Sequence, residues 1–383
     1  MLFTTSEQTS PVAWSVCATE TLEARVVRVK GNLRSDPSLS SKSLEDFFMS
    51  RVSYSRFRPA VALLGLSLSV LAGCGSDATT SVPADSAAPD RIAASSTTEV
   101  ASVTSEVAYS AADANGTVTL SAQPVKIISL SPTHTEMLFA IGAGGQLIAA
   151  DDQSNFPAEA SAVKSDLSGF TPNIEAIAGY KPDLVVISAD MSKLAEQLSQ
   201  IGIPVWLGLS AASLDDVYAQ INQLGALTGN GDAASALVAK MTADVASIVA
   251  DVPKLRKPLT YYHELDPTYY SATSNTFVGQ LYAMAGLRNI ADTAESGNDY
   301  PQLSAEFIVS QNPDVVFLAD TKCCQQDAAL VTARDGWSQV NAVKNGNVVA
   351  MDDDIASRWG PRVVDYLRAI VDAVNAAAAG SAG

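Results

Sequence analysis

Hydrophobic residues between positions 123 and 383 follow two alternating spacings. Short β-branched runs bounded by polar residues or Gly predict strands at 125–130, 146–150, 183–188, 203–208, 259–264, 314–319 and 347–351. Segments with apolar residues at helical spacing predict helices at 133–142, 173–180, 192–202, 214–229, 276–286, 304–311 and about 361–378. This alternation predicts an α/β fold with mostly parallel sheets that are covered on both faces.

One short pattern occurs twice. The sequence "NIEAIAGYKPDLVVIS" at 173–188 is echoed by "SAEFIVSQNPDVVFLA" at 304–319, with Glu, Ile, Pro-Asp and Val at matching positions. A weaker echo links "LFAIGAG" at 138–144 with "LYAMAG" at 281–286. The repeat predicts two similar Rossmann-like lobes, an N-terminal lobe at 123–229 and a C-terminal lobe at 257–383.

Between the predicted lobes, the apolar residues of 232–253 recur at i, i+3 and i+4. This spacing predicts one long connecting helix within 230–256, and about 20 helical residues would be roughly 30 Å long. A ligand cleft is expected between the lobes, where the carboxyl ends of the strands and their loops converge.

The N-terminal part of the chain carries a targeting signal. Residues 60–71 form a short apolar run that follows Arg51, Arg56 and Arg58 and precedes "AGC". This order is typical of a secretory signal, and twelve residues are too few to span a bilayer as a helix. The "LAGC" ending at Cys74 resembles the bacterial lipobox, which implies cleavage before Cys74 and diacylation of its thiol. The alternative is a buried apolar helix with a chance cysteine.

These signals set the expected boundaries. We predict that translation begins at Met49, that 1–48 is not translated or is unstructured, and that 49–73 is the lipoprotein signal peptide. Residues 74–122 are rich in Ser, Thr, Ala, Asp and Pro, which predicts a disordered tether. The expected location is the outer face of the bacterial cytoplasmic membrane, with the soluble body anchored through Cys74.

Charge and missing motifs argue against several classes of function. The net charge of −17 opposes nucleic acid as a partner. The chain has no G-x-S-x-G and no Walker A motif, and "GNGDAA" at 229–234 follows a helix instead of a strand. Two histidines are too few for a typical zinc or manganese carrier. We therefore predict a binding protein without enzymatic activity, cofactor or metal site.

Several motifs together resemble one family. "IISLSPTHTEMLFAIGAG", "PNIEAIAGYKPDLVV", "SAEFIVSQNPDVVF" and "SRWGPRVVDYL", with the long helix between them, resemble the periplasmic-binding-protein family for ferric siderophores, haem and cobalamin. The resemblance implies two Rossmann-like lobes joined by a single long helix, with the ligand held in the cleft between them.

The resemblance also implies a function. We expect a monomeric lipoprotein that captures an iron-siderophore or cobalamin-type metal chelate and delivers it to an ABC permease dimer with its ATPase subunits. Three alternatives stay open: a haem-binding lipoprotein, a lipoprotein that senses or scavenges ligand without a transporter, and a chelatase-like enzyme.

Glu175 and Glu306 are the expected docking residues. In the family, one surface glutamate of each lobe pairs with arginines of the permease, and these two residues match those positions. Separated carboxylates suit guanidinium groups and fix orientation. The local alternative is a favourable macrodipole contact in the first turn of a helix, with Thr171 as N-cap and Pro172 as first helical residue. That alternative does not explain why the glutamate is repeated.

The resemblance also suggests ligand contacts. Gly169 and Tyr300 lie six positions before the docking glutamates, and Phe170 adjoins Gly169 as an apolar wall. Asp354 and Arg358 have the spacing of cobalamin-binding members, and their local alternative is a surface i, i+4 pair. The full set of expected ligand contacts is Thr133, His134, Gln153, Gly169, Phe170, Tyr300, Asp354, Arg358 and Trp359.

Histidine and cysteine leave two further questions open. His134 and His263 each follow the first strand of a lobe, so they either face each other across the cleft as haem ligands or are hydrogen-bonded residues without that role. Cys323 and Cys324 are adjacent in "TKCCQQD". They form either a vicinal disulfide or two reduced thiols.

Overall fold

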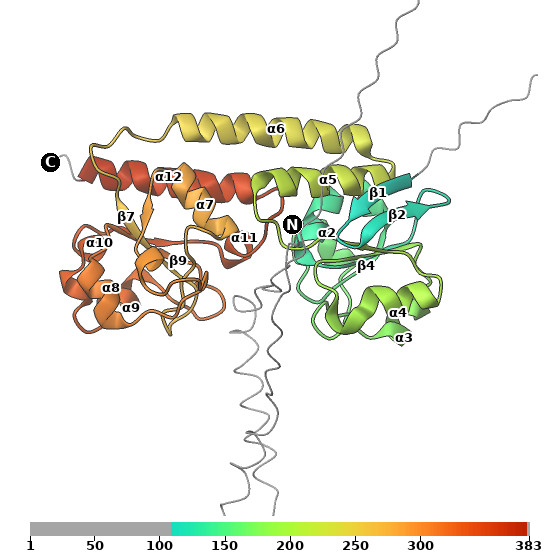
Figure 1. Ribbon diagram of the computed structural model, residues 1–383, viewed down its shortest axis with the longest axis horizontal. Coiled ribbons are helices and arrows are strands. Elements are labelled where there is room, and N and C mark those ends of the chain that lie inside the picture. The colour runs from blue at the N-terminus through green and yellow to red at the C-terminus, as the bar shows by residue number, and fades with distance from the viewer. Residues whose placement is uncertain (1–108, 381–383) are drawn as a thin grey trace, which may run out of the picture. The chain divides into compact units, whose positions relative to one another are not determined.

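A computed structural model describes residues 109–380, and within them two parallel sheets carry the fold (Figure 1). The first sheet has the order β4-β3-β5-β6 and consists of β3 Ile127–Leu130, β4 Leu147–Ala150, β5 Leu184–Ile187 and β6 Val205–Leu207. The second has the order β10-β9-β7-β8 and consists of β7 Thr260–Glu264, β8 Arg288–Asn289, β9 Val315–Leu318 and β10 Val348–Ala350.

The two sheets share one topology. In each, the first strand along the chain lies between the second and the third, and the fourth strand lies outside the third. Strands β3, β5, β7 and β9 are buried along their whole length, as expected for sheets covered by helices on both faces. The predicted α/β class with parallel sheets is confirmed.

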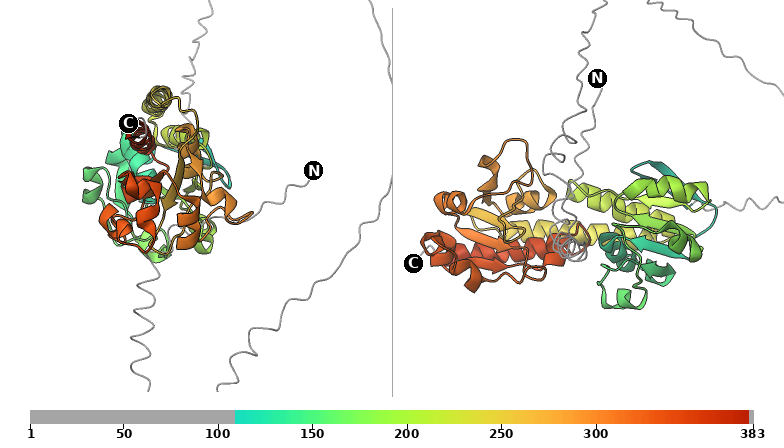
Figure 2. Two further views of the ribbon diagram at one scale, coloured as in Figure 1. Left: turned by 90° about the vertical axis from the view of Figure 1, so that its left-hand side faces the viewer. Right: turned by 90° about the horizontal axis from the view of Figure 1, so that it is seen from below.

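Helices flank both sheets (Figure 2). The N-terminal half contains α2 Pro132–Ala140, α3 Ile174–Gly179, α4 Leu194–Gln200, α5 Leu214–Thr228 and the 3-10 turns Ala143–Gln146, Ala158–Ala162 and Met191–Lys193. The C-terminal half contains α7 Phe277–Met284, α8 Ala305–Gln311, α9 Ala328–Thr332, α10 Asn341–Lys344, α11 Asp353–Ala356, α12 Val363–Gly380 and the 3-10 turns Ala291–Thr293 and Trp337–Gln339.

Helix α6, Gly231–Ala250, lies between the two halves in the chain and packs against α5 of the first half and α12 of the second (Figure 1). This is the position that the sequence predicted for a connecting helix. Its 20 residues and apolar composition would also suit a membrane span. Its contacts with α5 and α12 instead make it part of the folded body.

An additional hairpin corrects the predicted tether. Strands β1 Tyr109–Asp113 and β2 Gly116–Leu120 pair antiparallel, so the prediction of disorder for 74–122 is wrong for these residues. The hairpin is bonded to β6: the Trp206 indole donates to the Ala112 carbonyl at 3.0 Å, and the Leu207 amide donates to Asp113 Oδ2 at 3.0 Å. An Asn-Gly turn before "TVTL" is the signal that predicts such a hairpin. The remaining predictions for 1–108, including Cys74, lie outside the described residues.

The repeated Pro-Asp pair has a structural explanation. Asp183 Oδ2 accepts from the amides of Val125 at 3.0 Å and Lys126 at 2.9 Å. Asp314 Oδ2 accepts from the amide of Thr260 at 2.9 Å and from its hydroxyl at 3.0 Å. In both halves, an aspartate just before the third strand therefore fixes the start of the first strand. The repeat of Pro-Asp follows from the repeated fold.

Candidate docking and ligand sites

Helices α3 and α8 present the two repeated glutamates in the same way. Asn173 caps α3 by accepting from the Ala176 amide at 3.0 Å, and Ser304 caps α8 by accepting from the Phe307 amide at 3.1 Å. The prediction that Thr171 is the N-cap is wrong, because the helix begins two residues later and Asn173 has the extended backbone that a cap requires.

Glu175 and Glu306 lie in the first turn of these helices, and both are exposed. Within 109–380, none of the ion pairs involves either residue. The helix macrodipole favours a carboxylate at each position. Neither carboxylate forms an ion pair with another described residue.

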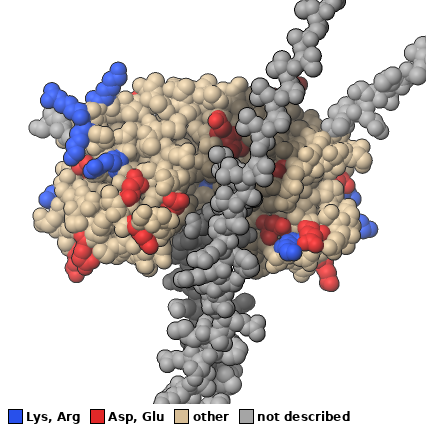
Figure 3. Space-filling model, in the orientation of Figure 1, with Lys and Arg blue, Asp and Glu red and all other residues tan. Residues whose placement is uncertain are grey.

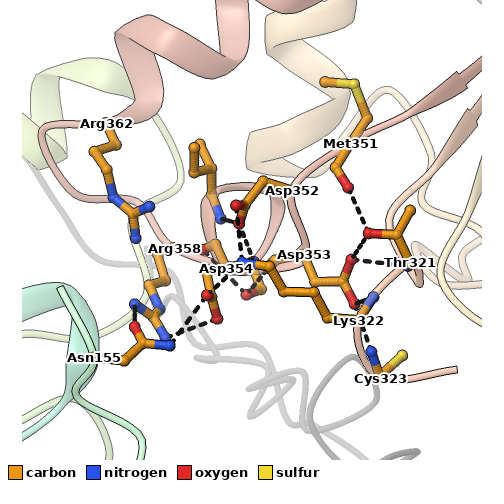
Figure 4. A network of polar contacts seen from close by, with 12 residues as sticks. Asn155, Thr321, Lys322, Cys323, Met351, Asp352, Asp353, Asp354, Arg358 and Arg362 are labelled. Atoms are coloured by element: carbon orange, nitrogen blue, oxygen red, sulfur yellow. Dashed lines mark hydrogen bonds and ion pairs between the residues drawn. The ribbon is translucent and has the colours of Figure 1, made fainter. Parts of the chain in front are cut away.

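A polar network brings three of the predicted ligand contacts together (Figure 4). The Arg358 guanidinium donates to Asp354 Oδ1 at 3.0 Å and to the Gln153 carbonyl at 3.2 Å. It also donates to Asn155 Oδ1 at 2.8 Å and Glu136 Oε1 at 2.9 Å. Arg358 is only 6% exposed, and four protein groups accept from its guanidinium, so its role as a ligand contact stays a prediction.

Asp354 is tied to the loop after β9. Lys322 Nζ donates to Asp352 and to Asp354, each at 2.8 Å. Burial alone would raise the pKa of Asp354, but the hydrogen bond from Lys322 and the charge of Arg358 outweigh burial and lower it. The alternative of an isolated surface pair is therefore wrong, since the Asp354–Arg358 contact belongs to a larger network.

The loop that carries Cys323 and Cys324 lies against the acidic residues 352–354. Asp353 accepts from the backbone amides of Thr321 at 2.8 Å and Cys323 at 2.9 Å. The Sγ atoms of Cys323 and Cys324 lie 2.7 Å apart. Whether this pair is oxidised stays a prediction, to be checked by counting thiols in the native protein.

His134 and Trp359 lie in the interior. His134 is fully buried, with Nδ1 2.8 Å from Ser131 Oγ and Nε2 3.0 Å from Gln220 Oε1. Burial lowers its pKa to about 4. The Trp359 indole donates to the same Gln220 oxygen at 3.0 Å. Thr133, the residue before His134 in the sequence, is also buried. All three residues are enclosed by protein in this structure, and their role as ligand contacts stays a prediction.

His263 has a separate environment. It is buried on β7, its Nδ1 lies 3.0 Å from the Tyr282 hydroxyl, and burial lowers its pKa to about 4. The arrangement in which His134 and His263 face each other across a cleft as haem ligands is therefore wrong. His134 packs against Trp206 of its own half and Trp359 of the other half, whereas His263 packs against Tyr282.

The other predicted contacts lie on loops that follow strands. Gln153 and Phe170 are exposed, whereas Gly169 and Tyr300 are half-buried. At Gly169 an added Cβ would lie 2.4 Å from the Leu130 carbonyl oxygen. Glycine is therefore required here because another backbone approaches closely.

Tyr270 is a candidate contact that the sequence analysis missed. The Ser271 amide donates to the Pro301 carbonyl at 3.0 Å, and the Leu303 amide donates to the Tyr269 carbonyl at 3.0 Å. This pairing places the half-buried Tyr270 opposite Gln302, on the loop that also carries Tyr300. The tyrosine pair at 269–270 after a strand end was the available signal.

A second buried ion pair lies at the carboxyl end of β7. Arg334 donates to both oxygens of the fully buried Glu264, at 2.6 and 2.5 Å, and its guanidinium lies over the Trp337 ring at 4.8 Å. Burial, and then the charge of Glu264, raise the pKa of nearby Asp320 to about 8. Among the described residues no group of three possible metal ligands is found. We interpret this cluster as structural.

Fold and motifs together define a two-part α/β solute-binding protein. The chain belongs to the periplasmic binding protein family, which matches residues 127–355.

Named relatives agree with this assignment. The chain is 30% identical over 321 residues to the uncharacterized ABC transporter substrate-binding lipoprotein YvrC of Bacillus subtilis, covering 82% of this chain and 95% of the relative. It is 33% identical over 270 residues to a cobalamin-binding protein of Halobacterium salinarum, covering 68% and 72%. These relatives are named as binding proteins, which confirms the prediction that the chain is not an enzyme.

Solved structures share the fold. A possible iron-binding periplasmic solute-binding protein from Staphylococcus epidermidis has a TM-score of 0.58 at 27% identity, covering 66% of this chain and 99% of its own. The periplasmic vitamin B12 binding protein BtuF of Vibrio cholerae has a TM-score of 0.57 at 23% identity, covering 67% and 98%.

Proposed function

We propose that this protein is the substrate-binding lipoprotein of an ABC importer, and that it captures a cobalamin-type ligand and delivers it to a permease dimer. The observation that carries the delivery role is the pair Glu175 and Glu306. Each is exposed in the first turn of the repeated helix, at equivalent positions in the two halves. Each carboxylate is therefore available to a guanidinium group of a partner.

The contrast with the repeated aspartates supports this proposal. Asp183 and Asp314 recur because each bonds to the first strand of its half. The glutamates recur without such a bond. A repeated fold therefore accounts for the aspartates, whereas a partner that contacts both halves accounts for the glutamates.

Replacing both glutamates tests the delivery role. Glu175→Ala with Glu306→Ala is expected to abolish uptake in cells while leaving ligand affinity unchanged, because the substitutions remove only permease contacts. The matched control is Glu196→Ala with Glu295→Ala. It removes one exposed glutamate from each half, including one in a helix first turn, and should leave uptake intact. Undiminished uptake in the first variant would contradict docking through these residues.

The ligand class rests on the relatives and on chemistry. The Halobacterium salinarum relative is named a cobalamin-binding protein, and half-buried Tyr270 offers apolar ring surface to a flat macrocycle. Ferric siderophores form the second candidate class, favoured by the Staphylococcus epidermidis structure named as possibly iron-binding. Haem remains a third class, although neither histidine is placed as an axial ligand.

Membrane attachment is proposed through Cys74. The Bacillus subtilis relative is named a lipoprotein, and "LAGC" ends the predicted signal at this residue. Incorporation of labelled fatty acid into the wild-type chain, and its loss in Cys74→Ala, is the expected result. Continued labelling of the variant would place the anchor elsewhere.

A further inference from the structure

A buried carboxylate of the N-terminal half is shared by two arginines of the C-terminal half. Glu136, on α2, is 3% exposed. Its Oε1 accepts from Arg358 Nη1 at 2.9 Å, and its Oε2 accepts from Arg362 Nε at 2.9 Å. Arg362 Nη2 also donates to Oε1. Both arginines lie between α11 and α12, far from α2 in the sequence.

The loop after β4 is held by the same arginines. Arg358 donates to Asn155 Oδ1 at 2.8 Å and to the Gln153 carbonyl at 3.2 Å. The Arg362 guanidinium lies over the Phe156 ring at 4.1 Å. Two segments of the N-terminal half, α2 and 153–156, therefore contact one short segment of the C-terminal half.

The charge of Glu136 is balanced by two arginines of the other half. Arg358 is paired with Glu136 and Asp354, and Arg362 is paired with Glu136. The Arg358 side chain is 4% exposed and the Glu136 side chain 2%. Breaking a buried pair leaves a charge without compensation, which is far more costly than separating an exposed pair. Separating the two halves at this point would leave the Glu136 carboxylate buried without a compensating charge.

Close packing at Gly360 gives independent support. An added Cβ at Gly360 would lie 3.3 Å from Glu136 Oε2 and 3.5 Å from the Thr133 carbonyl oxygen. The backbone of the C-terminal half thus approaches α2 so closely that a side chain would press on the carboxylate. The ion pairs and the close backbone packing therefore both hold Glu136 against the C-terminal half.

We propose that Glu136 is a positioning residue that locks the two halves in one relative orientation. Glu136 acts through its ion pairs with Arg358 and Arg362. Asp354 pairs with Arg358 and with Lys322, which connects the network to the loop after β9. The loops of the two halves that carry the predicted ligand contacts are thereby held at a fixed distance from each other. The inference concerns the protein without ligand, so it stands or fails independently of the ligand class proposed above.

Hydrogen exchange of Glu136→Gln tests this proposal, because the amide keeps the shape of the side chain and removes its charge. In the full chain without ligand, exchange is expected to rise at least about tenfold in both 151–157 and 352–362. Strands β3 and β7 should keep their protection. The control Asp251→Asn removes the partner of Arg368 in an exposed pair, with side chains 56% and 42% exposed, and should leave both segments unchanged.

A second pair of variants covers the case in which Glu136→Gln does not fold. Arg362 is more exposed, at 14% of its side chain, so Arg362→Gln is the milder change. It should raise exchange in the same two segments, and Arg362→Lys, which keeps the charge, should restore part of the protection. Wild-type exchange in either segment of a folded charge-removing variant would overturn the proposal.

Discussion

At the scale of single residues, the repeated motif separates into structural and functional positions. Each aspartate is consumed by backbone bonds within its own half, whereas each glutamate faces outward. The sequence shows that both recur but gives no reason for either. Assigning the reasons required knowing which carboxylates the fold already uses.

Predicted ligand contacts show what residue type alone cannot tell. Gln153, Asp354 and Arg358 were each predicted as ligand contacts, and the structure brings the three together. Their partners Glu136, Asn155 and Arg362 were missed, because bonds across about 200 positions leave no local pattern. His134 and Trp359 are residue types typical of ligand sites, yet both are buried with Gln220.

Gly169 gives a prediction at this scale. Because a Cβ there would clash with the Leu130 carbonyl oxygen, Gly169→Ala should lower the free energy of unfolding by about 1–3 kcal/mol. Urea titration measures the change. Gly145→Ala is the control, since a Cβ at Gly145 meets nothing within 4 Å. Equal stability of the two variants would show that the backbone at Gly169 yields without cost.

At the scale of elements, the principal strands and the longer helices were predicted, whereas β8 and the shortest helices were not. Every predicted strand has its counterpart in β3–β7, β9 or β10, because β-branched runs bounded by polar residues are a strong strand signal. Strand β8 has two residues, and α9, α10 and α11 have four or five. Elements this short do not show a repeated spacing of apolar residues from which they could be predicted. Tertiary contacts with neighbouring elements stabilise them instead.

Asp314 gives the prediction that belongs to this scale. Its carboxylate accepts from the Thr260 amide and hydroxyl and from Asn341 Nδ2 at 3.1 Å. Asp314→Ala leaves these donors unpaired and should cost about 1–3 kcal/mol of stability, measured by thermal or urea unfolding. Glu306→Ala, eight positions earlier, should change stability by less than about 0.5 kcal/mol. A costly Glu306→Ala would mean that the glutamate has a structural role.

At the scale of the whole molecule, the sequence predicted the doubled α/β architecture because the repeat lies in the buried strands and in the helices that precede them. It did not predict the ion cluster at Glu136, which depends on how the two halves meet. On the face shown in Figure 3, acidic side chains occur over both halves, in agreement with the net charge of −17. A strongly negative net charge disfavours polyanionic partners.

Ligand binding is the central claim, and calorimetric titration tests it most directly. The full chain, and the Glu175→Ala, Glu306→Ala variant as control, would each be titrated with cyanocobalamin, a ferric hydroxamate and haemin. We predict saturable one-to-one binding of cyanocobalamin with equal affinity in both proteins. Binding of only the ferric hydroxamate or only haemin would reject the cobalamin assignment. The absence of saturable binding for all three would contradict the account as a whole.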